Sequence, residues 1–235
     1  MYQFSIKLTD INTDPCGIAN IEVSDGFYGK ALSEMDGACI QFIRDRLIRH
    51  MQRIVLYTVS MPVSDREAYA RALQNARAIG VEAVKICACA LGDCSEEIIA
   101  QAAELVRIGE AVGVKLAFEP RAKYPALTLD VYKKLRSKGT CLIFNPMEFV
   151  KQDKNPFLTV LYKYKHKEDI LFLRVNDCLY GGGPVMVEQG NSEIKECASN
   201  LLARSFHGYF SFTPYLTDTP TRQVVDAFLY TLTQM

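Results

Sequence analysis

Short apolar stretches alternate with longer amphipathic segments along the whole chain. Each apolar stretch is bounded by polar, glycine or proline residues and contains many β-branched and aromatic side chains, which predicts a β-strand. The predicted strands cover residues 3–9, 19–23, 53–59, 82–88, 114–119, 140–145, 170–175 and 209–213.

The amphipathic segments between these strands predict helices. Ser64 stands at an N-cap position with Glu67 three residues later, and Gly80 follows the last apolar position of that helix. Ser95 opens another helix, which Gly113 ends. The other predicted helices cover residues 31–52, 127–137, 191–203 and 219–232.

Eight strands alternating with helices predict a single (β/α)8 TIM-barrel domain over residues 1–235. The link between the first two strands is too short for a full crossover helix, so that helix is expected to be short or missing. An open doubly wound sheet is the alternative. Such a sheet often carries a glycine-rich phosphate turn after its first strand, and here that turn reads TDINTDPCG.

Charge and targeting signals narrow the function classes. Lys+Arg and Asp+Glu both number 27, and this balance argues against a general nucleic-acid-binding protein. The N-terminus lacks the apolar core of a signal peptide, and no apolar run is long enough to cross a bilayer. We therefore expect a cytoplasmic protein with no membrane partner.

The eight cysteines are expected to be reduced in that compartment. Three of them lie close together in the sequence CACALGDC, which lacks the paired knuckle spacing of a zinc site. Cys87 and Cys89 are expected to be thiols on one face at a strand end, with a structural zinc site as the less favoured alternative.

Several segments in order resemble the xylose-isomerase-like superfamily of sugar phosphate isomerases and epimerases. The resemblance covers residues 17–214. Its segments are IANIEVSDGFYG, AYARALQNARAIGVEAVKI, IAQAAELVRIGEAVGVKLAFEP, LRVNDCLYGGGPVMVEQGNSEI and FHGYFSFTP. The resemblance implies a TIM barrel that moves a proton next to a carbonyl group, with a divalent metal at the carboxyl ends of the strands.

Carried over residue by residue, that metal site is largely dismantled here. Glu119 matches the acidic ligand of the fifth strand. Asn145 replaces an aspartate, Glu148 and Arg174 replace histidines, and Thr213 replaces a glutamate. A guanidinium offers only donors and cannot bind a cation. We therefore expect no metal ligands and no cofactor, with a divalent metal bound through Glu119 and Asn145 as the disfavoured alternative.

The residues at these positions form the candidate site. The candidate catalytic residues are Glu119 and Glu148, as a base and an acid. The candidate substrate-binding residues are Arg121, Asn145, Arg174, Asp177, Gly182 and Thr213. Arg174 is expected close to Glu119, where it supplies the charge of the missing metal or forms a purely structural ion pair. Asn145 could equally cap a turn, and the glycine loop around Gly182 could contact phosphate or serve only as a flexible connection.

Three functions fit this pattern. The first is a divergent sugar or sugar-phosphate isomerase or epimerase that binds a small polar or anionic, carbohydrate-like ligand. The second is a non-catalytic small-molecule-binding or regulatory protein on the same barrel, so the sequence leaves open whether the chain is an enzyme. The third is an abasic-site endonuclease, which needs a histidine-rich cluster of metals. The chain has only three histidines, which argues against this third function and against a nucleic-acid partner.

Overall fold

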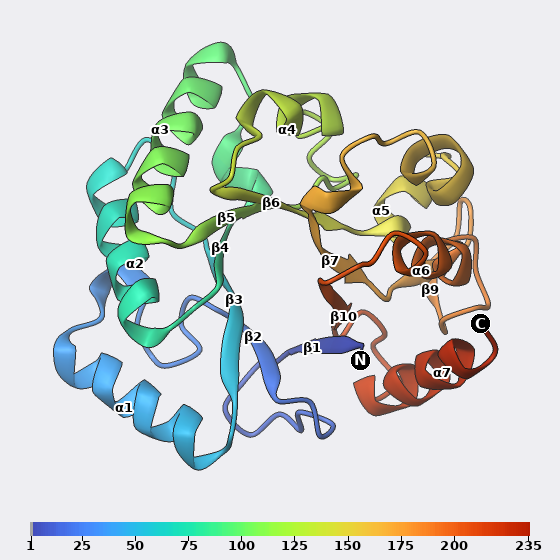
Figure 1. Ribbon diagram of the computed structural model, residues 1–235, viewed down its shortest axis with the longest axis horizontal. Coiled ribbons are helices and arrows are strands. Elements are labelled where there is room, and N and C mark those ends of the chain that lie inside the picture. Colours follow the sequence, from blue (N-terminus) through green and yellow to red (C-terminus); the bar gives the residue numbers. More distant parts are fainter. Residues whose placement is uncertain (1) are drawn as a thin grey trace. The chain divides into compact units, whose positions relative to one another are not determined.

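The computed structural model describes residues 2–235, and its main sheet has the order of a closed parallel barrel, β1-β10-β7-β6-β5-β4-β3-β2 (Figure 1). Its strands are β1 (Gln3–Lys7), β2 (Asn20–Ser24), β3 (Arg53–Val59), β4 (Ala83–Ile86), β5 (Lys115–Phe118), β6 (Thr140–Phe144), β7 (Ile170–Arg174) and β10 (Tyr209–Phe212). Each overlaps a predicted strand, so the (β/α)8 barrel is confirmed. Residues 8–19 form turns without a helix, as expected for the first crossover.

The helices follow the strands in the expected order. They are α1 (Gly37–Arg49), α2 (Arg66–Ile79), α3 (Glu96–Val112), α4 (Leu129–Leu135), α5 (Pro146–Val150), α6 (Ile194–Leu202) and α7 (Thr221–Thr233). Three short 3-10 helices, η1 (Leu32–Glu34), η2 (Ala88–Leu91) and η4 (Lys167–Asp169), and a π-helix, η3 (Pro156–Leu161), complete them. Within residues 2–235, no helix combines the length and the apolar character needed to cross a membrane.

The chain divides into two compact units. The β2–β5 unit comprises Leu8–Pro120 and Tyr124–Leu142, and the β7–β10 unit comprises Met1–Lys7, Arg121–Lys123 and Ile143–Met235. Strand β6 crosses the boundary. The expectation of one domain over residues 1–235 stays a prediction.

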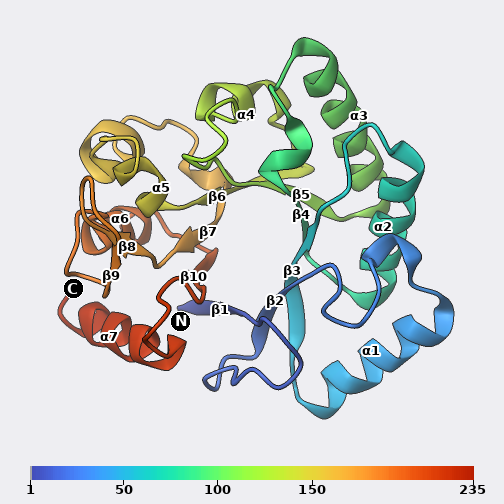
Figure 2. The same cartoon turned by 180° about the vertical axis from the view of Figure 1, so that it is seen from behind.

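In the β2–β5 unit, parallel strands are flanked by α1, α2 and α3, which Figures 1 and 2 show along one side of these strands. Helix α2 buries Ala72, Leu73 and Ala76 completely. Gly80 ends α2 in the left-handed conformation at φ 92°, where a side chain would be strained, so the predicted stop is confirmed.

The prediction of one continuous helix over residues 31–52 is wrong, because this segment forms two separate elements, η1 and α1. The side chain of Asp36 accepts a hydrogen bond from the backbone N–H of Cys39 at 2.8 Å and caps α1. A short 3-10 turn, η1, precedes this cap, so the amphipathic pattern that runs through residues 31–52 belongs to two elements.

The predicted N-cap of α2 is also displaced by one residue. Asp65, and not Ser64, accepts the backbone N–H of Ala68, at 3.0 Å. We therefore expect Asp65→Ala to lower the free energy of unfolding by about 1 kcal/mol, because one N–H of the first turn loses its partner. The matched variant Ser64→Ala should change stability by less than about 0.5 kcal/mol. Urea denaturation of both variants measures the difference, and equal losses would contradict this assignment.

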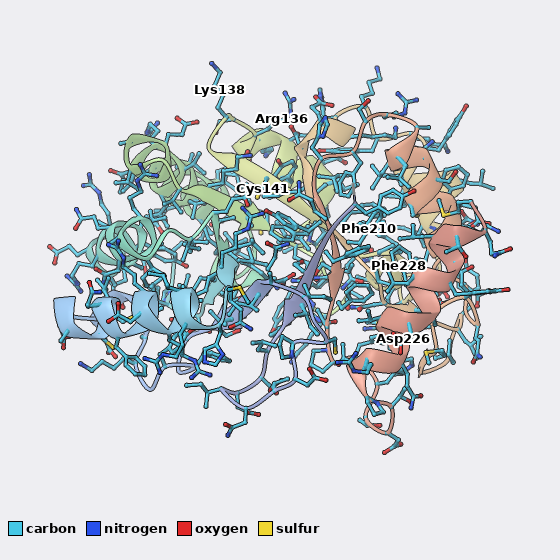
Figure 3. All side chains as sticks on the ribbon, turned by 60° about the horizontal axis from the view of Figure 1, so that its bottom comes forward. Arg136, Lys138, Cys141, Phe210, Asp226 and Phe228 are labelled. Atoms are coloured by element: carbon cyan, nitrogen blue, oxygen red, sulfur yellow. The ribbon has the colours of Figure 1, made fainter. Side chains whose placement is uncertain are left out.

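In the β7–β10 unit, α7 packs on β10 through aromatic rings. The ring of Phe228 lies 5.1 Å, centroid to centroid, from that of Phe210, and Figure 3 labels both residues. It lies 5.9 Å from the ring of Phe212. All three side chains are fully buried. Offset and tilted rings at these separations stabilise the packing beyond the apolar area that they bury.

Candidate functional site

A buried ion pair stands at the carboxyl ends of β4 and β5. Lys85 in β4 lies in register with Ala117 in β5, and Glu119 follows two residues later on the same face of the sheet. The ammonium Nζ of Lys85 donates to Oε2 of Glu119, and the two side chains are only 9% and 3% exposed. A pair so shielded from water interacts more strongly than a surface pair.

Sequence reasoning missed Lys85, although the sequence carried a signal for it. The residue interrupts an apolar strand, AVKI, just as Arg174 interrupts ILFLRV. A charged side chain inside a buried strand needs a partner, because an unpaired buried charge is costly. Glu22 in β2 is a further buried carboxylate that the sequence analysis did not single out.

Arg174, the last residue of β7, is buried beside a serine of the neighbouring strand. It lies in register with Ser211 of β10, and its Nη1 donates to the Ser211 hydroxyl. Ser211 is in turn in register with Ser5 of β1, and all three residues are buried. The β7–β10 unit therefore carries a buried polar row at one level of its strands. The pairing of Arg174 with Glu119 stays a prediction.

Glu148, the other candidate catalytic carboxylate, is held on several sides. Its oxygens accept the backbone N–H of Ala122 at 2.9 Å, Nζ of Lys151 at 2.9 Å and Nη2 of Arg121 at 3.4 Å. The carboxylate is buried, whereas the Arg121 side chain is 41% exposed. In this arrangement Glu148 ties residues 121–123 to helix α5. A catalytic role for it stays a prediction.

Two further candidates lie directly after strands. Asn145 follows β6 and is buried at the N-cap position of α5, without capping that helix through its side chain. Thr213 follows β10, and its hydroxyl donates to Oδ1 of Asn176 at 2.9 Å. Asn176 itself is buried. These positions, after the carboxyl ends of barrel strands, are where TIM-barrel enzymes place their chemistry.

Asp177 organises the segment that contains Gly182. Its carboxylate accepts three backbone N–H groups, from Cys178, Gly190 and Ser192, each at 2.9 Å. Strand β8 (Asp177–Cys178) pairs with β9 (Pro184–Val185) to form a hairpin, and Gly182 lies in the turn of this hairpin. The glycine segment is thus the turn of a hairpin, which sequence reasoning did not anticipate.

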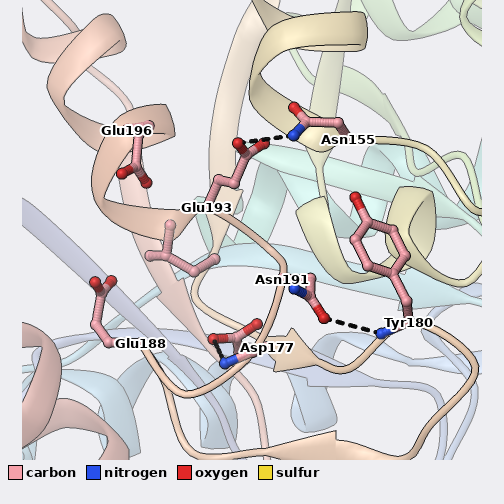
Figure 4. Close-up of a pocket in the computed structure, with 9 residues that line it drawn as sticks. Asn155, Asp177, Tyr180, Glu188, Asn191, Glu193 and Glu196 are labelled. Carbon is pink, nitrogen blue, oxygen red and sulfur yellow. Dashed lines mark hydrogen bonds between the residues drawn. The ribbon is translucent and has the colours of Figure 1, made fainter.

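A cavity of about 300 Å³ lies beside this hairpin (Figure 4). Its lining includes the carboxylates of Asp177, Glu188, Glu193 and Glu196. Burial raises the pKa of Glu188, and the neighbouring Glu196 and Asp177 raise it further. The carboxylates of Asp177 and Glu193 are already occupied, the latter by Asn155 and the N–H of Phe157. A cavity of this charge does not suit a phosphate.

The residues at the expected metal-ligand positions do not suit a divalent cation. Glu119 already accepts the ammonium of Lys85, and Arg174 presents only donors. The hydroxyl of Thr213 donates to Asn176 and, unlike a carboxylate, supplies no negative charge to a cation. In the part of the chain that the structure describes, no three His, Cys, Asp or Glu side chains are grouped to hold a metal ion. The expectation of a protein without a metal cofactor stays a prediction.

Solved structures share this fold at low sequence identity. A xylose isomerase domain protein from Planctomyces limnophilus is 10% identical, with a TM-score of 0.75 over 99% of this chain and 96% of that one. A D-tagatose 3-epimerase-like protein is 13% identical, with a TM-score of 0.73 over 99% and 97%. A family 2 AP endonuclease from Brucella melitensis is 16% identical, with a TM-score of 0.69 over 98% and 99%.

These similarities confirm, at the level of the fold, the resemblance seen in the sequence. No protein-family profile matches the sequence, and no curated protein does. Because one fold serves sugar epimerases and AP endonucleases alike, the fold alone does not identify the function, which depends on the side chains at the strand ends.

Proposed function

We propose that this chain binds a small polar or anionic, carbohydrate-like ligand at the carboxyl ends of the barrel strands and isomerises or epimerises it by proton transfer. The Lys85–Glu119 pair carries the proposal. Its carboxylate stands where the resembling family places an acidic metal ligand, and its ammonium supplies a positive charge at the same place.

The pair provides the two groups that such a reaction needs. The Glu119 carboxylate can accept a proton from the carbon next to a carbonyl group. The Lys85 ammonium can stabilise the negative charge that develops on the carbonyl oxygen, because a fixed charge in a site shielded from water needs no reorganisation. A proton delivered to the opposite face of the same carbon gives epimerisation. A proton delivered to the neighbouring carbon, with a second proton passing between the two oxygens, gives isomerisation.

Hydrogen exchange into the ligand tests this proposal directly. The protein is incubated in D2O, with and without EDTA, together with sugars, sugar acids and sugar phosphates that stabilise it in a thermal-shift screen. NMR then follows deuterium at the carbon next to the carbonyl. We expect exchange with the wild type and its loss, by roughly a hundredfold or more, in Glu119→Gln, because a general base contributes on that scale.

The controls separate catalysis from binding. Lys133→Ala, which removes the cation of an exposed pair with Asp130, should exchange like the wild type. Ligand stabilisation without any exchange would point to the non-catalytic binding protein instead. No stabilisation by any compound at millimolar concentration would overturn the proposal, and exchange that EDTA abolishes would show that the chemistry depends on a metal.

A further inference from the structure

Two thiols meet just beyond the end of β4. Sγ of Cys89 donates to Sγ of Cys87 across 3.0 Å. Both cysteines are free thiols; Cys89 is exposed to solvent and Cys87 is partly buried. Cys141, Cys178 and Cys197, by contrast, are buried. The pair therefore combines close approach with access from solvent.

The turn after β4 brings the two sulfurs together. The N–H of Cys87 donates to the carbonyl of Val59 at 3.2 Å, which anchors this residue to the neighbouring strand. The chain then enters the 3-10 helix η2, in which the N–H of Ala90 donates to the carbonyl of Cys87 at 2.9 Å. In an extended strand, residues two apart are separated by about 6.6 Å of chain rise. The two thiols lie at a strand end as expected, but their placement on one face of a strand is wrong, because β4 ends at Ile86 and the turn that follows brings the two sulfurs together.

We propose that Cys87 and Cys89 form a reversible dithiol–disulfide site that reacts with small-molecule disulfides. A disulfide bond needs sulfurs about 2.05 Å apart, so closure requires an approach of about 1 Å from the geometry of the reduced pair. The proposal does not depend on the proposed function of the Lys85–Glu119 pair.

The reaction proceeds by two exchanges. The thiolate of Cys89, the exposed member, attacks one sulfur of an external disulfide RSSR, forms a mixed disulfide and releases RS⁻. The thiolate of Cys87 then attacks the Cys89 sulfur, which forms the internal disulfide and releases the second RS⁻. The protein loses two protons and two electrons, and RSSR is reduced to two RSH.

The environment of Cys89 sets the pH dependence of the first exchange. The hydrogen bond to Cys87 raises the pKa of Cys89, and burial adds to this rise. Because only the thiolate attacks, the reaction should be slow at neutral pH and accelerate as the pH rises toward the pKa of this thiol.

Mass spectrometry of the full chain after treatment with oxidised glutathione tests the proposal. The remaining thiols are blocked with iodoacetamide before digestion with trypsin. The peptide 86–107 then contains Cys87, Cys89 and Cys94, and its fragmentation locates the bond. We expect this peptide to lose two hydrogens, to carry a blocked Cys94 and to retain no glutathione. Dithiothreitol should reverse the change.

Single substitutions show whether both thiols take part. Cys87→Ser should keep glutathione on Cys89 as a stable mixed disulfide, because the second thiol is missing. Cys94→Ser is the matched control from the same segment, and it should behave like the wild type. The internal disulfide should also be favoured roughly tenfold more in the folded chain than in urea, since the fold holds the sulfurs together.

Three results would overturn the proposal. The first is glutathione that accumulates on Cys89 of the wild type without closure. The second is a disulfide that includes Cys94. The third is a Cys87–Cys89 disulfide that forms no more favourably in the folded chain than in the unfolded one.

Discussion

Replacement of Lys85 by methionine is expected to lower the free energy of unfolding by about 3–5 kcal/mol at neutral pH. The variant keeps most of the side-chain volume but leaves the Glu119 carboxylate buried beside an apolar group. Protonation of that carboxyl relieves the cost, so the loss should shrink as the pH falls toward the range in which carboxyl groups titrate. Urea denaturation at several pH values measures both effects.

The double variant Lys85→Met with Glu119→Gln should recover at least half of this loss, because the stranded charge is gone. The exposed pair Lys133–Asp130 supplies a matched control, and Lys133→Ala should cost no more than about 1 kcal/mol. Two results would show that the two buried groups do not stabilise each other. One is a loss of no more than about 1 kcal/mol in Lys85→Met. The other is a loss in the double variant that equals the sum of the losses in the two single variants.

The strands could be predicted from the sequence because a strand that is buried on both faces appears as a nearly continuous run of apolar residues. All eight barrel strands begin and end within two residues of their predicted bounds, since polar or glycine residues interrupt each apolar run. Gly80 and Gly113 end α2 and α3 as expected, because both adopt the left-handed conformation that glycine favours.

Helix α5 and the break before α1 could not be predicted from a comparable sequence pattern. Helix α5 has only five residues, Pro146–Val150, too few for helical periodicity to appear. It is stabilised instead by the contacts of Glu148 with residues 121–122, which are distant in sequence. The break before α1 depends on the capping side chain of Asp36, and the apolar pattern runs across it unchanged.

The sequence was sufficient to predict which strand-end residues form the candidate site, but not which side chains they contact. Glu119 and Arg174 were recognisable as charges at strand ends, where barrel chemistry resides. Their partners Lys85 and Ser211 depend on strand register, which sets the residues that face each other across neighbouring strands. The resemblance to the family pointed only to positions that hold metal ligands there. None of these positions lies on β4, so the resemblance did not point to Lys85.

Replacement of Asp177 by alanine is expected to lower the free energy of unfolding by about 3 kcal/mol or more. This buried carboxylate accepts the N–H groups of Cys178, Gly190 and Ser192, and each buried N–H left without an acceptor costs about 1–3 kcal/mol.

Asp177→Asn separates this structural role from ligand binding. Its remaining carbonyl oxygen can still accept Cys178 and Ser192, which share Oδ1 in the wild type, whereas its amide faces the N–H of Gly190 as a second donor. We therefore expect an intermediate loss of stability, measured by urea denaturation of both variants. If Asp177→Asn were as stable as the wild type but no longer stabilised by the sugar ligands, Asp177 would bind substrate and not organise the hairpin.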